Sequence, residues 1–133
     1  MISNKAEVDY WLELADSDIG LENIQQTKEM CYNLINSNLL QTFDIDGTGI
    51  FAYILSKDFD GRTGFLEMLF YIRKEDRGNL RLVKKYILKA ESIAKESGCN
   101  VVKIGANIKY KDITFLKLLQ RWGYILDTVS KEI

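Results

Sequence analysis

The fold is decided by residues 65–98, which read FLEMLFYIRKEDRGNLRLVKKYILKAESIAKESG. Residues 65–72 form a nearly continuous apolar run that only Glu67 interrupts, a pattern typical of a central strand covered on both faces. A helical stripe follows, with apolar residues three or four positions apart: Leu80, Val83, Ile87, Ala90 and Ala94. Asn79 is placed to cap the start of this helix, and Gly98 to end it. The stretch therefore predicts a buried strand followed by a long helix.

Three further segments predict how this strand is paired. Residues 101–105 form a short β-branched run after the helix, so the strand, helix and strand make a crossover whose two strands are parallel. Residues 39–45 and 50–55 predict an antiparallel hairpin around Asp46-Gly47-Thr48-Gly49, because an Asp-Gly step favours the positive φ that tight turns require. A mixed parallel and antiparallel sheet is expected.

Helices are predicted at both ends of the chain. Val8, Trp11, Leu12 and Ala15 recur at helical spacing, residues 21–35 do so less cleanly, and residues 16–20 separate the two runs. Residues 113–122 predict a helix closed by Gly123, and residues 124–129 predict a last strand. The expected architecture is a single α/β domain over residues 1–133, with a mixed central sheet, helices on both faces and two opening helices.

Composition excludes several classes of function. The 133 residues carry a net charge of −1, which gives no overall field to attract nucleic acid, so nucleic acid is not an expected partner. The sequence has no histidine, which excludes a Ser-His-Asp triad and a His-ligated metal. Cys31 and Cys99 show neither metal spacing nor a disulfide framework, and are interpreted as buried apolar side chains. No apolar run is long enough to cross a membrane and no signal segment is apparent, so a cytoplasmic protein is expected.

Basic residues gather where the long helix begins: Arg73, Lys74, Arg77, Arg81, Lys84 and Lys85. A helix start carries unpaired N–H groups and a partial positive charge, so a purely structural helix favours Asp or Glu there. The inverted charge indicates an anionic partner such as a phosphate. The alternative is a solvated basic face balanced by Glu75, Asp76 and Glu91.

The same segment resembles the cofactor motif of the GNAT superfamily of acyl-CoA N-acyltransferases. Residues 71–78, Tyr-Ile-Arg-Lys-Glu-Asp-Arg-Gly, match the approach, and Arg77-Gly78 opens the family's Arg-Gly-x-Gly-x-Gly/Ala signature. Leu80 and Leu82 stand where the family has small residues. The helix end AESIAKESG and Gly123-Tyr124 also resemble family features, so the likeness, to a divergent member, spans residues 39–129.

This resemblance implies acetyl-CoA as cofactor and an N-acetyltransferase that acts on a small-molecule or peptide amine. Backbone groups near residues 71–73 would pair with the pantetheine arm between two splayed strands, and amides of residues 77–82 would hold the pyrophosphate. The cofactor-binding residues so implied are Ile72, Arg73, Arg77, Gly78, Asn79, Leu80, Arg81 and Leu82.

Two side chains are candidates for proton transfer. Glu67 is the carboxylate in an apolar strand and the candidate base; its alternatives are an outward-facing position or a pairing with Arg73. Leu119 occupies the position of the family's usual tyrosine acid, so Tyr71 or Tyr110 is the candidate proton donor, although each also suits a packing role. Where the family has an asparagine upstream of that tyrosine, this chain has Asp112, with Asn107 nearby but out of register.

Other interpretations stay open at this point. Asp16, Asp18 and Glu22 lie between the opening helices, where carboxylates suit either a cationic acceptor or ordinary helix capping. The changes at Leu80, Leu82 and Leu119 also permit a GNAT-like domain without catalysis that serves as a binding or structural module. A homodimer is retained as a hypothesis.

Overall fold

The computed structural model describes residues 4–57, 61–105 and 113–126, together with residues 131 and 133. Its elements are α1 (Lys5–Ile19), α2 (Ile24–Asn36), β1 (Gln41–Phe43), β2 (Gly49–Lys57), β3 (Thr63–Ile72), the 3-10 turn η1 (Lys74–Asp76), α3 (Leu80–Glu96), β4 (Val101–Lys103) and α4 (Ile113–Arg121). The predicted order of helices and strands is confirmed up to α4.

The described strands form one mixed sheet in the order β1-β2-β3-β4. β1 and β2 pair antiparallel, as do β2 and β3, whereas β3 and β4 are parallel. The hairpin turn between β1 and β2 has positive φ at Asp46 and Gly47, as the Asp-Gly step predicts. β3 is an inner strand, and the crossover through α3 is confirmed.

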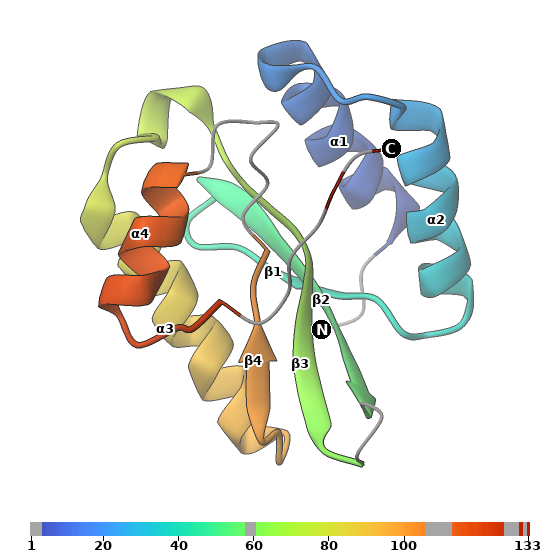
Figure 1. The fold of residues 1–133 in the computed structure, drawn as a ribbon. Coiled ribbons are helices and arrows are strands. Elements are labelled where there is room, and N and C mark those ends of the chain that lie inside the picture. The colour runs from blue at the N-terminus through green and yellow to red at the C-terminus, as the bar shows by residue number, and fades with distance from the viewer. Residues whose placement is uncertain (1–3, 58–60, 106–112, 127–130, 132) are drawn as a thin grey trace.

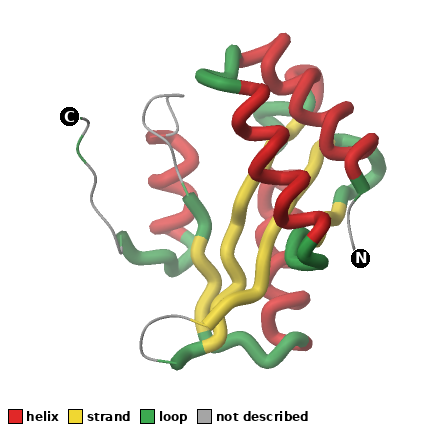
Figure 2. The backbone as a smooth tube through the Cα atoms, turned by 90° about the vertical axis from the view of Figure 1, so that its right-hand side faces the viewer, coloured by secondary structure: helices red, strands yellow, loops and turns green. Residues whose placement is uncertain are grey.

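Helices cover both faces of this sheet, as Figure 1 shows with α3 and α4 on one side and α1 and α2 on the other. Figure 2, turned by 90°, shows the helix pair α1 and α2 in front of the strands. A buried core lies on each face of the sheet. Alternate residues of β2 contribute to the two cores, because successive side chains of a strand point to opposite faces. Phe51 and Tyr53 pack with α3, whereas Ile50 and Ala52 pack with α1.

A bulge changes this alternation in β3. Tyr53 pairs with Glu67 and Ala52 with Leu69, so Met68 is an extra residue without an opposite partner. Met68 and Leu69 consequently both pack against the cluster under α1 and α2. Directly opposite residues share a face, so Glu67 follows Tyr53 to the α3 face, whereas Tyr71 follows Ile50 to the α1 face.

The first helix is longer than predicted. Residues 16–20 were expected to form the linker, but α1 runs to Ile19 and ends at Gly20, whose φ is 70°. The Gly20 N–H donates to the Asp16 carbonyl, and the Asp16 carboxylate accepts from the Leu21 N–H at 2.8 Å. These bonds satisfy the main-chain groups at the helix end. Asp16 and Asp18 therefore belong to the last turn of α1.

The predicted strand over residues 124–129 is wrong for its described part, since residues 124–126 lie in no strand. Tyr124 is instead tied to two helices: its N–H donates to the Leu119 carbonyl at 3.0 Å, and its hydroxyl donates to Glu91 of α3 at 2.8 Å. Residues 127–129 lie outside the described part. β1 and β4 are also shorter than expected, with three residues each.

Tyr86 of α3 joins the helix to the hairpin turn. Its side chain is fully buried, and its hydroxyl accepts from the Ile45 N–H at 3.1 Å and lies 2.9 Å from the Thr48 hydroxyl. Burial raises the pKa of this phenol. The hydroxyl thus satisfies main-chain and side-chain groups that the turn leaves near the core.

Replacing Tyr86 by phenylalanine is expected to lower the free energy of unfolding by about 1–3 kcal/mol, because the Ile45 N–H loses its acceptor. Urea denaturation followed by circular dichroism measures the change. Tyr53 is the matched control, since it is 4% exposed and its hydroxyl has no hydrogen bond within the described residues. Tyr53→Phe should leave stability nearly unchanged, and an equal loss in both variants would contradict the role of the Tyr86 hydroxyl.

Candidate functional site

The described pairing of the two parallel strands covers only the first part of β3. Gly64, Phe65 and Leu66 pair with Val101, Val102 and Lys103, and there the described pairing ends. β3 continues to Ile72. The Arg73 N–H donates to Thr48 at 2.8 Å, so in an antiparallel ladder the main-chain groups of Phe70 and Ile72 point away from β2, towards the β4 side. Main-chain donors and acceptors of β3 beyond Leu66 therefore have no described partner strand on the β4 side.

The start of α3 follows the end of β3 in the chain, after the short turn η1. The Asn79 side chain accepts from the Leu82 N–H at 3.2 Å, which confirms the predicted cap. Within the described part of the chain, the amides of Gly78, Asn79, Leu80 and Arg81 have no acceptor. A helix start of this kind carries a partial positive charge and binds anions. Gly78 has φ of 95°, and a Cβ there would meet nothing within 4 Å.

The two leucines in the motif do not fill this helix start. Leu82 is 8% exposed and packs in the core with α4 and the sheet. Leu80 is 55% exposed on the surface. The side chain of Leu82 therefore points away from the free amides, and the family's small residue at that position is replaced by a core residue.

The basic residues divide into two groups. Lys74, Arg81 and Lys85 are exposed near the helix start, and Lys84 lies 4.5 Å from the ring centroid of Trp122. Arg73 is turned away from α3. Its guanidinium donates to the Gly47 carbonyl at 2.9 Å and to the Tyr10 hydroxyl at 2.6 Å, and lies 4.9 Å from the ring centroid of Trp11. Only some of the basic residues predicted to gather at the start of α3 therefore do so.

Arg77 is turned to the same side as Arg73. Its guanidinium forms an ion pair with Asp18 of α1, donates to the Ile72 carbonyl at 3.2 Å and lies 5.7 Å from the ring centroid of Tyr71. The Tyr71 hydroxyl donates to the same Asp18 oxygen at 2.8 Å. Asp18, Tyr71 and Arg77 therefore form one connected cluster between α1 and the segment that leads to α3.

The cluster fixes the protonation of its members. Burial by itself would raise the pKa of the Asp18 carboxyl, but hydrogen bonds from Arg77 and Tyr71 outweigh it, so this pKa lies below its usual value. Burial, together with the hydrogen bond to Asp18, raises the pKa of Tyr71 to about 12. Asp18 is thus charged and Tyr71 protonated at neutral pH.

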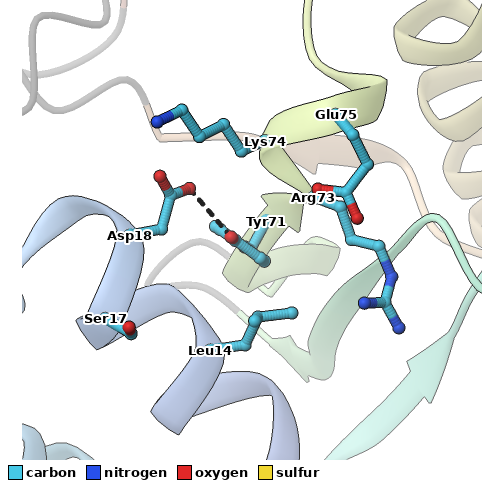
Figure 3. Close-up of a pocket in the computed structure, with 7 residues that line it drawn as sticks. All are labelled: Leu14, Ser17, Asp18, Tyr71, Arg73, Lys74 and Glu75. Carbon is cyan, nitrogen blue, oxygen red and sulfur yellow. Dashed lines mark hydrogen bonds between the residues drawn. The ribbon is translucent and has the colours of Figure 1, made fainter.

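A pocket of about 270 Å³ opens beside this cluster, and Figure 3 shows the residues that line it. The lining residues come from the last turns of α1 and from the end of β3 with η1: Leu14, Ser17, Asp18, Tyr71, Arg73, Lys74 and Glu75. Leu14 and Ser17 were not singled out from the sequence, although their three-residue spacing places them on one side of α1. A second pocket, of about 320 Å³, lies between β4 and the segment after α4.

The structure separates the two candidate catalytic residues. Glu67 is the first residue of β3 beyond the stretch paired with β4 and is partly buried on the α3 face, whereas Tyr71 is 6% exposed on the α1 face. Leu119 is 2% exposed in the core. Tyr110, Asp112 and Asn107 lie outside the described residues. Of the acidic residues between the helices, Asp16 caps the end of α1 and Asp18 pairs with Arg77.

Other expected features concern metals, cysteines and membranes. Within the described ranges, no group of three or more Cys, Asp or Glu side chains could hold a metal ion. Cys31 is buried as predicted, and Cys99 is partly buried next to the core under α3. None of the helices that the structure describes is both long and apolar enough to span a bilayer.

Comparison with known proteins places the fold. No protein-family model matches the sequence, and no curated protein matches it. Among solved structures, an aminoglycoside acetyltransferase from an uncultured soil metagenomic sample superimposes with a TM-score of 0.67 at 16% identity, over 98% of this chain and 93% of that one. A protein described as a predicted acetyltransferase, from Clostridium acetobutylicum and solved with acetyl-CoA, gives 0.71 at 12% identity, over 98% and 92%.

A third structure, described as a transcriptional regulator from Bacillus halodurans, gives a TM-score of 0.73 at 13% identity and covers 100% of this chain and 96% of that one. The mixed sheet, the parallel β3 and β4 pair, and the helix-first opening agree with the architecture predicted from the sequence. The chain has the fold of the GNAT-type acetyltransferases.

Proposed function

We propose that this protein is an N-acetyltransferase that transfers an acetyl group from acetyl-CoA to an amine. The observation that carries the proposal is the part of β3 beyond Leu66, which runs on to Ile72 without described β4 pairing. The free amides at the start of α3 lie at the far end of the same strand. A thioester arm and a pyrophosphate joined in one molecule match these two features.

The described residues fit coenzyme A. The main-chain groups of Phe70 and the Ile72 N–H point towards the β4 side and would pair with the amides of a pantetheine arm, whereas the Ile72 carbonyl accepts from Arg77. The amides of residues 78–81 would hold the pyrophosphate, with the exposed Arg81 and Lys85 nearby. Gly78 leaves room for a close approach of the phosphate to the backbone. When bound, acetyl-CoA supplies the activated acyl group as a thioester.

Glu67 is the proposed base and Tyr71 the proposed proton donor. Glu67 lies where the strand pairing ends, so its carboxylate would accept a proton from the attacking amine on the α3 face. Tyr71 retains its proton at neutral pH because its pKa is about 12. In the structure this proton is donated to Asp18, and a thiol is the stronger acid, with a pKa of about 8.5; transfer to the departing thiolate therefore requires the Tyr71 hydroxyl to turn away from Asp18.

The proposed acceptor is an amine of a small molecule or peptide. The fold neighbours include an aminoglycoside acetyltransferase solved with sisomicin, which supports small amines as the first compounds to test. Asp18 is already paired with Arg77, so the described residues do not assign it to a cationic acceptor. A panel of polyamines, amino sugars and peptide N-termini covers these classes.

A second candidate function is a coenzyme A-binding module without catalysis. The burial of Leu119 favours it, because the resemblance implies a tyrosine acid at that position and here the side chain belongs to the core. The second candidate retains the cofactor site and loses only the transfer step. Release of free thiol from acetyl-CoA in the presence of the amine panel separates the two functions.

Saturating acetyl-CoA is expected to stabilise the protein. A ligand that binds only the folded state at one hundred times its Kd adds roughly 2.7 kcal/mol, which corresponds to a Tm increase of about 8–12 °C for a domain of this size. Differential scanning fluorimetry measures the shift. NADH is the matched control ligand, since it has adenosine and a pyrophosphate without a pantetheine arm; a shift of similar size with NADH, or none with millimolar acetyl-CoA, would refute the proposal.

A further inference from the structure

Arg77 occupies an unusual place for a residue at a phosphate site. Its guanidinium does not extend beyond the helix start but folds back to the Asp18 carboxylate and the Ile72 carbonyl. Asp18 is 11% exposed in its side chain and Arg77 is 44% exposed, so the pair lies at the protein surface only on the arginine side. The cationic group of Arg77 is thus committed to α1 and β3.

The contacts of Arg77 span the segment that leads to α3. One partner is the carbonyl of Ile72, the last residue of β3, and the other is Asp18, which lies in the last turn of α1. Gly78 follows Arg77 directly and has φ of 95°. Glycine adopts positive and negative φ about equally well, so Gly78 does not by itself fix the direction of the chain. The contacts of the Arg77 side chain therefore fix the position of the backbone directly before Gly78, where the run of free amides begins.

Asp18 is itself fixed from a second direction. The Tyr71 hydroxyl donates to the same carboxylate oxygen at 2.8 Å, and Tyr71 is 6% exposed between β2 and α1. Figure 3 shows the Asp18 carboxylate directed at the Tyr71 hydroxyl, with the hydrogen bond between them dashed. Lys74 adds a further positive charge that favours the ionised carboxylate. Asp18 thus provides a charged and oriented acceptor for Arg77.

We infer that Asp18 is a positioning residue for the coenzyme A pyrophosphate, acting through Arg77 on the backbone that precedes α3. The inference rests on the proposed function, because it takes residues 78–81 as the phosphate site. Asp18 touches no phosphate in this scheme. It keeps the amides of that segment in the arrangement that binds an anion, so the affinity for coenzyme A depends on a carboxylate in α1.

A double-mutant cycle on coenzyme A affinity tests this inference. Isothermal titration gives Kd for the unmodified protein, Asp18→Asn, Arg77→Gln and the double variant. Each single variant is expected to bind about tenfold more weakly, and the double variant no more weakly than Arg77→Gln, because residues that act through one contact are not additive. Asparagine retains an acceptor for Tyr71 and removes only the charge.

Two control variants separate positioning from a general loss of stability. Asp16→Asn changes a carboxylate two positions away that bonds only to the Leu21 N–H in the described structure, and should bind coenzyme A as the unmodified protein does. Tyr86→Phe lowers stability without touching Asp18, and should also keep its affinity. In Asp18→Asn, hydrogen exchange of the Leu82 and Val83 amides, which bond to Asn79, is expected to become faster in the free protein, a change that neither control shows.

The possible outcomes are distinct. If Asp18→Asn binds coenzyme A with unchanged Kd, or if the two single effects add in the double variant, the positioning role is wrong while the proposed function stands. If Asp18→Asn binds more tightly, Arg77 is itself a phosphate ligand that Asp18 restrains, which also overturns the inference. If the unmodified protein fails to bind coenzyme A, the proposed function and the inference both fail.

Discussion

Gly49→Ala is expected to lower the free energy of unfolding by about 3 kcal/mol and Tm by about 10 °C. A Cβ at this position would lie 2.2 Å from the Tyr71 carbonyl oxygen and 3.0 Å from the Ile72 Cα. Both atoms are main chain, so relief requires β2 and β3 to move apart where they pair. Chemical denaturation monitored by tryptophan fluorescence measures the loss.

Gly105→Ala is the matched control for this substitution. Among the described residues, nothing lies within 4 Å of a Cβ built at Gly105, and its φ is not positive. The control should therefore change stability by less than about 0.5 kcal/mol. If Gly49→Ala were as stable as Gly105→Ala, the close approach of the two strands at Gly49 would not exist in solution.

Glu67→Gln is expected to slow acetyl transfer by about 100-fold or more while coenzyme A still binds, because general bases contribute rate factors of this size. Glutamine keeps the size of the side chain and removes its ability to accept a proton. The measurement is the single-turnover rate of thiol release with the best amine of the panel, together with Kd for coenzyme A from titration.

Glu96→Gln provides the control for the loss of a carboxylate. Glu96 is exposed and is the last residue of α3, at the opposite end of the helix from the proposed phosphate site. Its variant should retain the full rate. A Glu67→Gln protein with an unchanged rate would exclude Glu67 as the base, and the enzyme would then rely on a different proton acceptor for the amine.

Much of the fold follows from local patterns in the sequence. The apolar run of β3, the helical stripe of α3 with Asn79 at its start, and the Asp-Gly turn each depend on residues close together in the chain, and each is confirmed. The parallel pairing of β3 and β4 also follows, because a crossover helix between two strands leaves little choice of direction.

Other features depend on contacts between distant residues. The bulge at Met68 is set by how β3 pairs with β2, so periodicity could not show that Glu67 and Tyr71 face opposite sides. Arg73 and Arg77 lie in a basic run, yet the side chains of both turn towards α1. Arg73 contacts Tyr10 and Trp11 there, and Arg77 pairs with Asp18. Charge patterns place such side chains near a helix start without indicating their direction.

The short contact between β3 and β4 also bears on local stability. Within the described residues, three residue pairs join these strands, whereas nine pairs join β2 to β3. Regions held by few hydrogen bonds open at lower free energy than the core around them. The edge of the sheet at β4 is therefore expected to open at lower free energy than the pairing of β2 with β3. Within the described residues, β2 and β3 are thus the firmly paired strands of the sheet, and β4 is the weakly paired one.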